Sequence, residues 1–236
     1  MQQSPWWYRS RAVLFASFYV LGFLGGIALS RVAGQGTAPL FVSAGHALGS
    51  EGPRLLLGLA TLLVAAGWAV RVWGSAYLSA QIVWNPDART DTLLTAGPFA
   101  YVRNPLYLGS ALIALGIAAL ATPFGTVLIV AGNLGLMQML MRHETMLMRA
   151  RYGAAYDAYT RAVPAFFPRF APARIRGSPV LPSFAQGMRA EILSACLFAG
   201  MIAVWVSGEY AAGIFTVLWV GGWIAQRIAA RRAAAL

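Results

Sequence analysis

The chain has 236 residues, of which 59% are apolar and 11% are charged, whereas about a quarter of an average soluble domain is charged. So few charged side chains cannot cover a globule of this size with polar surface, which excludes an ordinary soluble enzyme and indicates a protein that lies mainly in lipid. The formal net charge is +11, and the single cysteine, Cys196, excludes an internal disulfide and a cysteine-based metal site.

Five apolar segments predict six membrane-spanning helices, because about 20 mostly apolar residues cross a bilayer as a helix. One segment is too long for a single span, and the turn residues Thr122-Pro123-Phe124-Gly125 divide it into a helical hairpin. The predicted spans are residues 12–30, 55–73, the two halves of 107–141, 191–207 and 211–226. The predicted fold is therefore all-α: a polytopic membrane helix bundle of about six transmembrane helices in one integral membrane domain, residues 1–236.

Small and polar residues inside these segments predict helix contacts. Gly22, Gly25 and Gly26 in the first span allow another helix to approach closely. Asn133 and Gln138 in the fourth span are expected to face the bundle rather than lipid.

The placement of the arginines predicts the orientation of the bundle. With six spans, Arg31 and Arg54 fall on one side of the membrane, and every other arginine falls on the side of the N-terminus. By the positive-inside rule, both termini are expected in the cytoplasm. Orientation in an anionic leaflet is sufficient to account for the basic charge, so the expected partner is the lipid bilayer and no nucleic-acid partner is predicted.

An unusual segment precedes the third predicted helix. Gly97-Pro98 predicts a turn, Pro105 suits the first turn of the helix, and Asn104 is the expected N-cap. A helix start offers free N–H groups and the positive end of the helix dipole. Since Arg103 adds a full charge, an anionic group such as an amino-acid carboxylate fits there. An ordinary helix entry, with Arg103 reaching towards lipid headgroups, fits the same residues.

A lone carboxylate, Glu144, lies at the cytoplasmic end of the fourth predicted helix. Side chains pair along a helix at a spacing of three or four residues, and no arginine stands at that spacing from Glu144. Its partner is therefore expected elsewhere, either Arg103 in a structural ion pair or a cationic ligand. The adjacent His143 is predicted to be an interfacial polar residue. Since His46 lies in an outside loop, no two-histidine metal site is predicted.

An apolar and aromatic stripe follows at helical spacing. It consists of Met148, Tyr152, Tyr156, Tyr159 and Val163. Two structures fit this pattern: a cytoplasmic amphipathic helix lying on the membrane plane, and a lid whose aromatic faces cover a cofactor. A proline-rich linker is predicted after the stripe.

These segments, in this order, resemble the isoprenylcysteine carboxyl methyltransferase and phospholipid methyltransferase superfamily of integral membrane enzymes. The runs that carry the resemblance are GPFAYVRNPLYLG at 97–109, HETMLMRARYGAAYDAY at 143–159 and VPAFFP at 163–168, within a similar core of about residues 55–168. The resemblance implies that S-adenosylmethionine binds near the cytoplasmic face, where a lipid-soluble or small amphipathic acceptor is methylated. An extra helical hairpin, 191–226, lies outside the similar core.

The resemblance also implies which residues contact the cofactor. Arg103 and Glu144 are the best candidates for positioning it, and Glu144 is expected to hold its ammonium group or a ribose hydroxyl. No catalytic residue and no metal ligand are implied. The implied cofactor-binding residues are Asp91, Thr92, Leu93, Leu94, Gly97, Phe99, Arg103, Asn104, Pro105, Leu106, Tyr107 and Glu144.

Three positions depart from the family pattern. Asn104 stands where the family usually has histidine and cannot act as a general base, and His143 replaces the first of two glutamates. Leu140 stands where the eukaryotic carboxyl methyltransferases have a substrate-binding arginine. A prenylated protein C-terminus is therefore not the expected acceptor.

Two alternative functions fit parts of the sequence. An NADPH-dependent membrane reductase of the sterol-reductase type has a similar helix layout and an R-H-P-N-Y run, in which Leu106 here replaces the asparagine. A non-enzymatic membrane scaffold fits the composition alone. The sequence leaves open the identity of the acceptor, the choice among O-, S- and N-methylation, and the oligomeric state.

Overall fold

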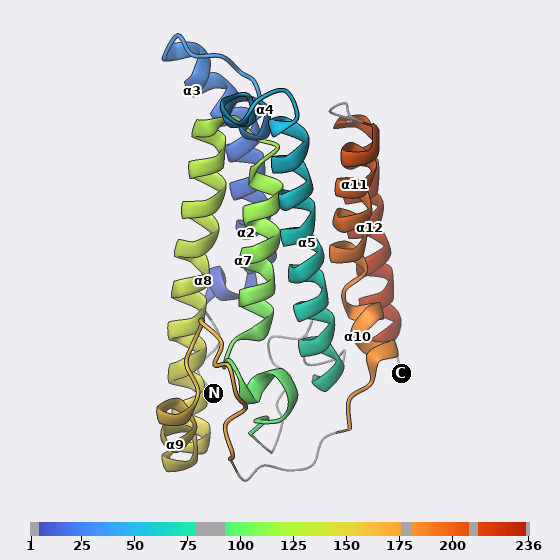
Figure 1. Cartoon of the computed structure of the whole chain (residues 1–236). Helices are drawn as coiled ribbons and strands as arrows, with labels where there is room; N and C mark the ends of the chain where they lie inside the picture. Colours follow the sequence, from blue (N-terminus) through green and yellow to red (C-terminus); the bar gives the residue numbers. More distant parts are fainter. Residues whose placement is uncertain (1–4, 79–92, 176–180, 208–211, 235–236) are drawn as a thin grey trace.

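The computed structural model describes residues 5–78, 93–175, 181–207 and 212–234, which form helices and connecting loops without a strand (Figure 1). The predicted all-α fold class is thus confirmed. The helices are α1 (Trp6–Arg9), α2 (Arg11–Val20), the π-helical turn η1 (Leu21–Gly25), α3 (Gly26–Val32), α4 (Leu40–Gly45), the 3₁₀ turn η2 (His46–Leu48), α5 (Gly52–Tyr77), the 3₁₀ turn η3 (Gly97–Ala100), α7 (Pro105–Ala118), α8 (Pro123–Tyr152), α9 (Ala154–Ala162), α10 (Phe184–Ala190), α11 (Ile192–Ser207) and α12 (Ala212–Ala234).

Fewer described helices than expected are long and apolar enough to cross a membrane. Three qualify, namely the continuous segment Arg11–Val32, α5 and α8, and the pair α10 and α11, bent by 70°, makes a fourth if it is counted as one span. The expected count of about six is therefore not confirmed, although each predicted segment is helical. With 14 residues, α7 is about 21 Å long, which is shorter than the ~30 Å hydrocarbon core.

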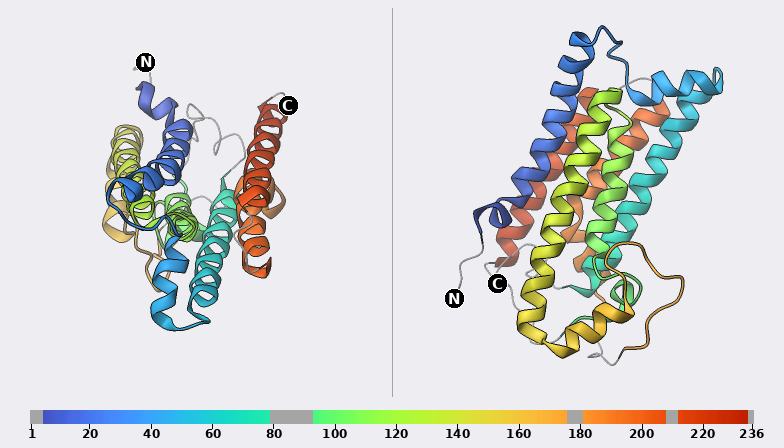
Figure 2. Two further views of the ribbon diagram at one scale, coloured as in Figure 1. Left: turned by 90° about the horizontal axis from the view of Figure 1, so that it is seen from above. Right: turned by 90° about the vertical axis from the view of Figure 1, so that its left-hand side faces the viewer.

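The helices pack around α7, which lies at the centre of the bundle in the view from above (Figure 2). α7 contacts α5 and α8, and α5 in turn contacts α4, α10 and α11. α12 packs on α11, so the C-terminal helices form an outer layer beside α5. The main apolar core joins α5, α7 and α11 through buried side chains that include Val64, Ile117, Met201 and Val204.

The loops and short helices that carry the motif residues gather at one end of this bundle. η3 and α9 lie at the end where α7 begins and α8 ends (Figure 1). α1 and the last turns of α12 point towards the same end (Figure 2). η3, which follows residues 79–92 in the chain, contacts α5 at this end.

The first helical segment packs closely on α8 through glycines. A Cβ atom added to Gly26 would lie 2.5 Å from Cα of Gly125, whereas one added to Gly25 would lie 3.8 Å from the nearest atom, on Leu128. Gly22 also faces α8, against Ile129. The predicted close packing is thus confirmed for Gly22 and Gly26, because small residues let helix backbones approach.

The predicted hairpin between α7 and α8 is confirmed. Thr122 caps α8, and its Oγ1 accepts a hydrogen bond of 3.2 Å from the backbone N–H of Gly125. Asn133 is buried as predicted and donates 2.8 Å to the carbonyl of Ile129. Gln138 is exposed on the outside of α8, so the prediction that it faces the bundle is wrong.

The two glycines of the first segment provide a matched test of helix packing. Gly26→Ala is expected to lower the free energy of unfolding by about 1–3 kcal/mol, because the added methyl group meets the backbone of Gly125, which cannot move aside. Gly25→Ala, the control, is expected to be neutral or slightly stabilising, since alanine favours the helix. Thermal unfolding of both variants in the same detergent measures the difference, and equal effects would contradict the packing.

Candidate functional site

The entry to α7 is tied to the segment that follows α9. The backbone N–H of Arg103 donates to the carbonyl of Pro164 at 2.9 Å, and Nδ2 of Asn104 donates to the carbonyl of Ala165 at 2.8 Å. Asn104 occupies the N-cap position of α7, as expected, but its side chain makes no capping hydrogen bond. The predicted capping function is therefore wrong, and the side chain instead joins two parts of the site.

The segment that follows α9 also pairs with the last residue of η3 and with the residue after it. The N–H of Arg169 donates 3.0 Å to the carbonyl of Tyr101, and the N–H of Ala173 donates 2.9 Å to the carbonyl of Ala100. Segments about 70 positions apart are thus paired through their backbones, which leaves few backbone groups in this loop without partners. Over residues 164–173, the predicted proline-rich linker is therefore paired with the loop that precedes α7.

Glu144 lies between two tyrosines from other helices. Its Oε1 accepts hydrogen bonds of 2.8 Å from the hydroxyl of Tyr107 on α7 and 3.1 Å from the hydroxyl of Tyr8 on α1. The described residues contain no ion pair between Glu144 and Arg103, so the expected structural ion pair is not formed. Arg11 lies over the ring of Tyr8, with its guanidinium carbon 4.8 Å from the ring centroid. The carboxyl group of Glu144 is thus held by two tyrosine hydroxyls and forms no ion pair with a cationic side chain of the described residues.

Arg103, which lies just before the first residue of α7, has unused hydrogen-bonding capacity. The residue is half-buried, and its Nε is buried without a hydrogen-bond partner among the described residues. Buried polar groups nearly always have a partner, so this N–H fits an anionic ligand group at the entry to α7. Tyr107, four positions after Arg103 in the chain, touches Glu144, whereas the charge of Arg103 acts on Tyr159, where it opposes the rise of the pKa.

The aromatic stripe packs against the protein rather than against a lipid surface. Tyr156, Tyr159 and Val163 are buried and contact Leu93 and Ile175. The interpretation of a helix lying with this face on the membrane plane is therefore wrong. α8 and α9 are also two helices here, because Gly153 between them has a φ of +50°, and Met148, exposed on α8, is not part of the cluster.

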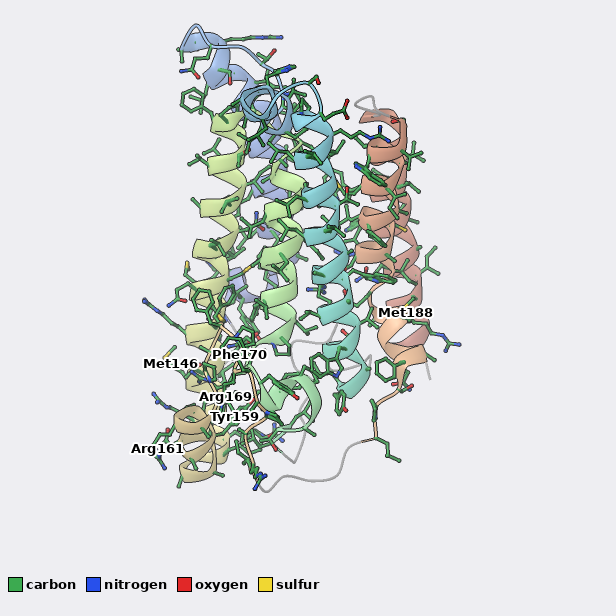
Figure 3. All side chains as sticks on the ribbon, in the orientation of Figure 1. Met146, Tyr159, Arg161, Arg169, Phe170 and Met188 are labelled. Atoms are coloured by element: carbon green, nitrogen blue, oxygen red, sulfur yellow. The ribbon has the colours of Figure 1, made fainter. Side chains whose placement is uncertain are left out.

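Tyr159 links α9 to η3. Its hydroxyl donates a 2.7 Å hydrogen bond to the carbonyl of Phe99. Burial of the phenol raises the pKa of Tyr159, and the neighbouring Tyr156 adds to the rise while Arg103 opposes it. Figure 3 shows Tyr159 beneath the bundle near Arg169, whereas Arg161 of the same helix points outwards. α9 thus holds the loop on which Phe99 lies.

The predicted turn at Gly97 is confirmed and requires glycine. The residue has a φ of +60°, and a Cβ atom added there would collide with the ring of Tyr77 at the end of α5. This contact fixes η3 against α5. The turn therefore sets the position of Phe99 relative to the entry of α7.

The structure brings most of the implied cofactor-binding residues to one place. Tyr107 joins the first turn of α7 to Glu144, while Tyr159 and Asn104 join the preceding loop to α9 and to the segment that follows α9. Asp91 and Thr92 lie outside the described residues. The described implied residues near this junction are Leu93, Leu94, Gly97, Phe99, Arg103, Asn104, Pro105, Leu106, Tyr107 and Glu144.

His143 contributes to an aromatic cluster on the outer side of Glu144. Its ring lies 5.1 Å from that of Trp7 and 4.9 Å from that of Tyr8. Its Nε2 is buried and has no partner among the described residues. Within the part of the chain that the structure describes, no group of three or more His, Cys, Asp or Glu side chains is placed to hold a metal ion.

Sequence reasoning missed a buried ion pair beside the site. Arg71 on α5 and Glu191 at the start of α11 meet with Nε to Oε2 at 2.6 Å and Nη2 to Oε1 at 3.0 Å. Ser75 and Ser194 donate to the same carboxylate at 2.8 and 2.7 Å. The available signal was the position of two opposite charges at the ends of apolar segments, since a charge bordering lipid is expected to have a partner.

A comparison with protein families finds a match that includes most residues of the candidate site. Residues 54–155 match the family described as phospholipid methyltransferase. The match includes α5, α7, α8, Arg103 and Glu144, and it confirms the resemblance predicted from the sequence. The segments that contribute Tyr8 and Glu191 lie outside it. No solved structure matches the chain.

Two curated relatives are named for metal resistance. The chain is 28% identical over 151 residues to the cobalt-zinc-cadmium resistance protein CzcN of Cupriavidus metallidurans, covering 64% of this chain and 65% of the relative. It is 30% identical over 115 residues to the nickel-cobalt-cadmium resistance protein NccN of Alcaligenes xylosoxydans xylosoxydans, covering 48% of this chain and 50% of the relative. The matched segments span less than two thirds of either relative.

The tyrosines of α9 give a matched test of the loop anchor. Tyr159→Phe is expected to destabilise the protein by about 1 kcal/mol, because the half-buried carbonyl of Phe99 loses its donor. Tyr156→Phe is the control, since the hydroxyl of Tyr156 has no hydrogen bond to any described residue. Hydrogen exchange of residues 97–102 and thermal unfolding measure the loss. Faster exchange in both variants alike would contradict the anchor.

Proposed function

Because the phospholipid methyltransferase match covers the residues at this junction, we propose that the chain is an S-adenosylmethionine-dependent membrane methyltransferase. The proposed acceptor is a lipid-soluble or small amphipathic molecule that reaches the site at the cytoplasmic face of the membrane. The observation that carries the proposal is the meeting of the two motif segments, with Tyr107 to Glu144 at 2.8 Å and Tyr159 to Phe99 at 2.7 Å.

The charges at the junction fit the two ends of an amino-acid group. The unpartnered Nε of Arg103 and the entry of α7 suit a carboxylate. Glu144, which has no cationic partner among the described side chains, suits an ammonium group or a ribose hydroxyl. Tyr8 and Tyr107 would keep the carboxylate aimed at the ligand, because each hydroxyl fixes one direction of its Oε1.

The bound cofactor would supply an activated methyl group whose transfer is favourable without further activation. The task left to the protein is to align the acceptor with the methyl group and to exclude water. Asn104 fits this mechanism, because its side chain donates a hydrogen bond to the carbonyl of Ala165 and is not needed as a base. An acceptor that is a thiolate, a carboxylate or an unprotonated amine needs no general base from the chain.

Removing either charge at the junction is expected to weaken cofactor binding. Glu144→Gln and Arg103→Ala should each raise the Kd for S-adenosylhomocysteine by about 10- to 100-fold, because each removes a charge-assisted hydrogen bond to the ligand. Asp157→Asn is the matched control, since Asp157 lies nearby in an exposed pair with Arg149 at 3.0 Å. Isothermal titration of purified protein measures the affinities, and wild-type affinity in both site variants would refute the assignment.

The ligand class is tested by thermal shift. S-adenosylhomocysteine at about 100 times its Kd is expected to stabilise the protein by about 2.7 kcal/mol, because it binds the native state. NADPH is expected to give no shift, and a shift with NADPH alone would favour the reductase. A methyl-transfer assay with labelled donor then identifies the acceptor class. Since both relatives are named for metal resistance, the panel includes small thiols, which are soft metal ligands, as well as lipids and amines.

A further inference from the structure

The buried pair of Arg71 and Glu191 reaches beyond the two helices that carry it. Glu191 is completely buried, and both of its oxygens accept two hydrogen bonds each, from Arg71 and from the serines Ser75 and Ser194. These four hydrogen bonds therefore fix the orientation of the Glu191 carboxylate. Its position at the bend between α10 and α11 is fixed relative to α5.

The third nitrogen of the same guanidinium extends this order to α7. Nη1 of Arg71 donates 2.6 Å to Oγ of Ser110 and 3.3 Å to the carbonyl of Leu106. Leu106 lies between Pro105 and Tyr107, in the first turn of α7. One planar guanidinium thus connects the C-terminal helices with the helix entry at which the proposed cofactor site is built.

Stability alone does not account for this arrangement. Replacing a buried ion pair by apolar residues is often neutral or stabilising, because desolvation of two charges offsets their attraction. α11 is already attached to α5 by apolar contacts that include Met201 and Val204. Apolar contacts tolerate small slides along a helix, whereas a bidentate pair with fixed donors holds one register. The apolar contacts already hold α11 against α5, and the ion pair additionally fixes the register of the two helices.

We propose that Arg71 and Glu191 are positioning residues, through which the C-terminal helices α10, α11 and α12 fix the first turn of α7 for cofactor binding. The inference rests on the proposed function, because the α7 entry is the proposed ligand site. It assigns a function to the extra hairpin, which lies outside the matched residues 54–155.

Arg71→Lys tests whether Arg71 positions the first turn of α7 or only attaches α11 to α5. Lysine keeps the charge next to Glu191, but one ammonium group cannot span both the carboxylate and the α7 groups as the forked guanidinium does. We expect the Kd for S-adenosylhomocysteine to rise about tenfold, the scale of a typical coupling between two sites. Hydrogen exchange at residues 106–110 should become faster, while exchange in α11 stays near that of the wild type.

Gln226→Leu is the matched control within the same hairpin. Oε1 of Gln226 accepts a 2.8 Å hydrogen bond from the N–H of Leu193, which joins α12 to α11 without touching α7. This variant should unfold at a lower temperature but bind the ligand with wild-type affinity. If it weakens binding as much as Arg71→Lys does, general loosening of the hairpin explains the effect and the proposal is overturned.

A second variant keeps the test decisive if Arg71→Lys fails to fold. Ser110→Ala removes one α7 partner of Arg71 and leaves the pair with Glu191 intact, so it should weaken binding and speed exchange at 106–110 in the same direction. Wild-type affinity and wild-type exchange in the folded variants overturn the proposal. If the wild-type protein does not bind S-adenosylhomocysteine, the proposed function fails, while the exchange measurement still decides whether Arg71 orders α7.

Discussion

The first turn of α7 depends on polar contacts from three distant segments, and the rest of the site follows from them. Arg71 binds the carbonyl of Leu106 from α5, Tyr107 reaches Glu144 on α8, and Asn104 holds the carbonyl of Ala165. In or beside lipid there is little water to satisfy such groups, so each must find a protein partner. The need to pair these groups brings the first turn of α7 together with α5, α8 and the segment that follows α9.

Local patterns predicted the parts of this site that depend on local chemistry. Gly97 sits in a turn with positive φ, and the predicted turn at Thr122-Pro123-Phe124-Gly125 separates α7 from α8. Both outcomes follow from the local preferences of glycine and proline. The lack of a helical partner for Glu144 was likewise visible, since spacing along one helix determines which side chains meet.

Patterns along the sequence did not identify the partners where the contact is distant. Tyr8 lies 136 positions from Glu144, and Arg71 lies 120 positions from Glu191. Spacing rules do not encode such pairs, because they arise only after the helices pack. The stripe containing Tyr156 and Tyr159 was ambiguous for the same reason: an apolar face has the same sequence whether lipid or protein covers it, and here residues such as Leu93 and Ile175 cover it. The span count differed in part because α7, with 14 residues, is shorter than the roughly 20 residues that cross a bilayer.

The family match covers the residues of the proposed ligand site but not all that hold them. Tyr8, which helps to orient Glu144, and Glu191, which fixes Arg71, both lie outside residues 54–155. The matched helices thus carry Arg103, Tyr107 and Glu144, while segments at the two ends of the chain restrict their geometry. If the proposed ligand binds here, its site combines residues inside the family match with supporting residues outside it. A change in the support is then expected to alter affinity without altering any residue that touches the ligand, because the first turn of α7 is common to both.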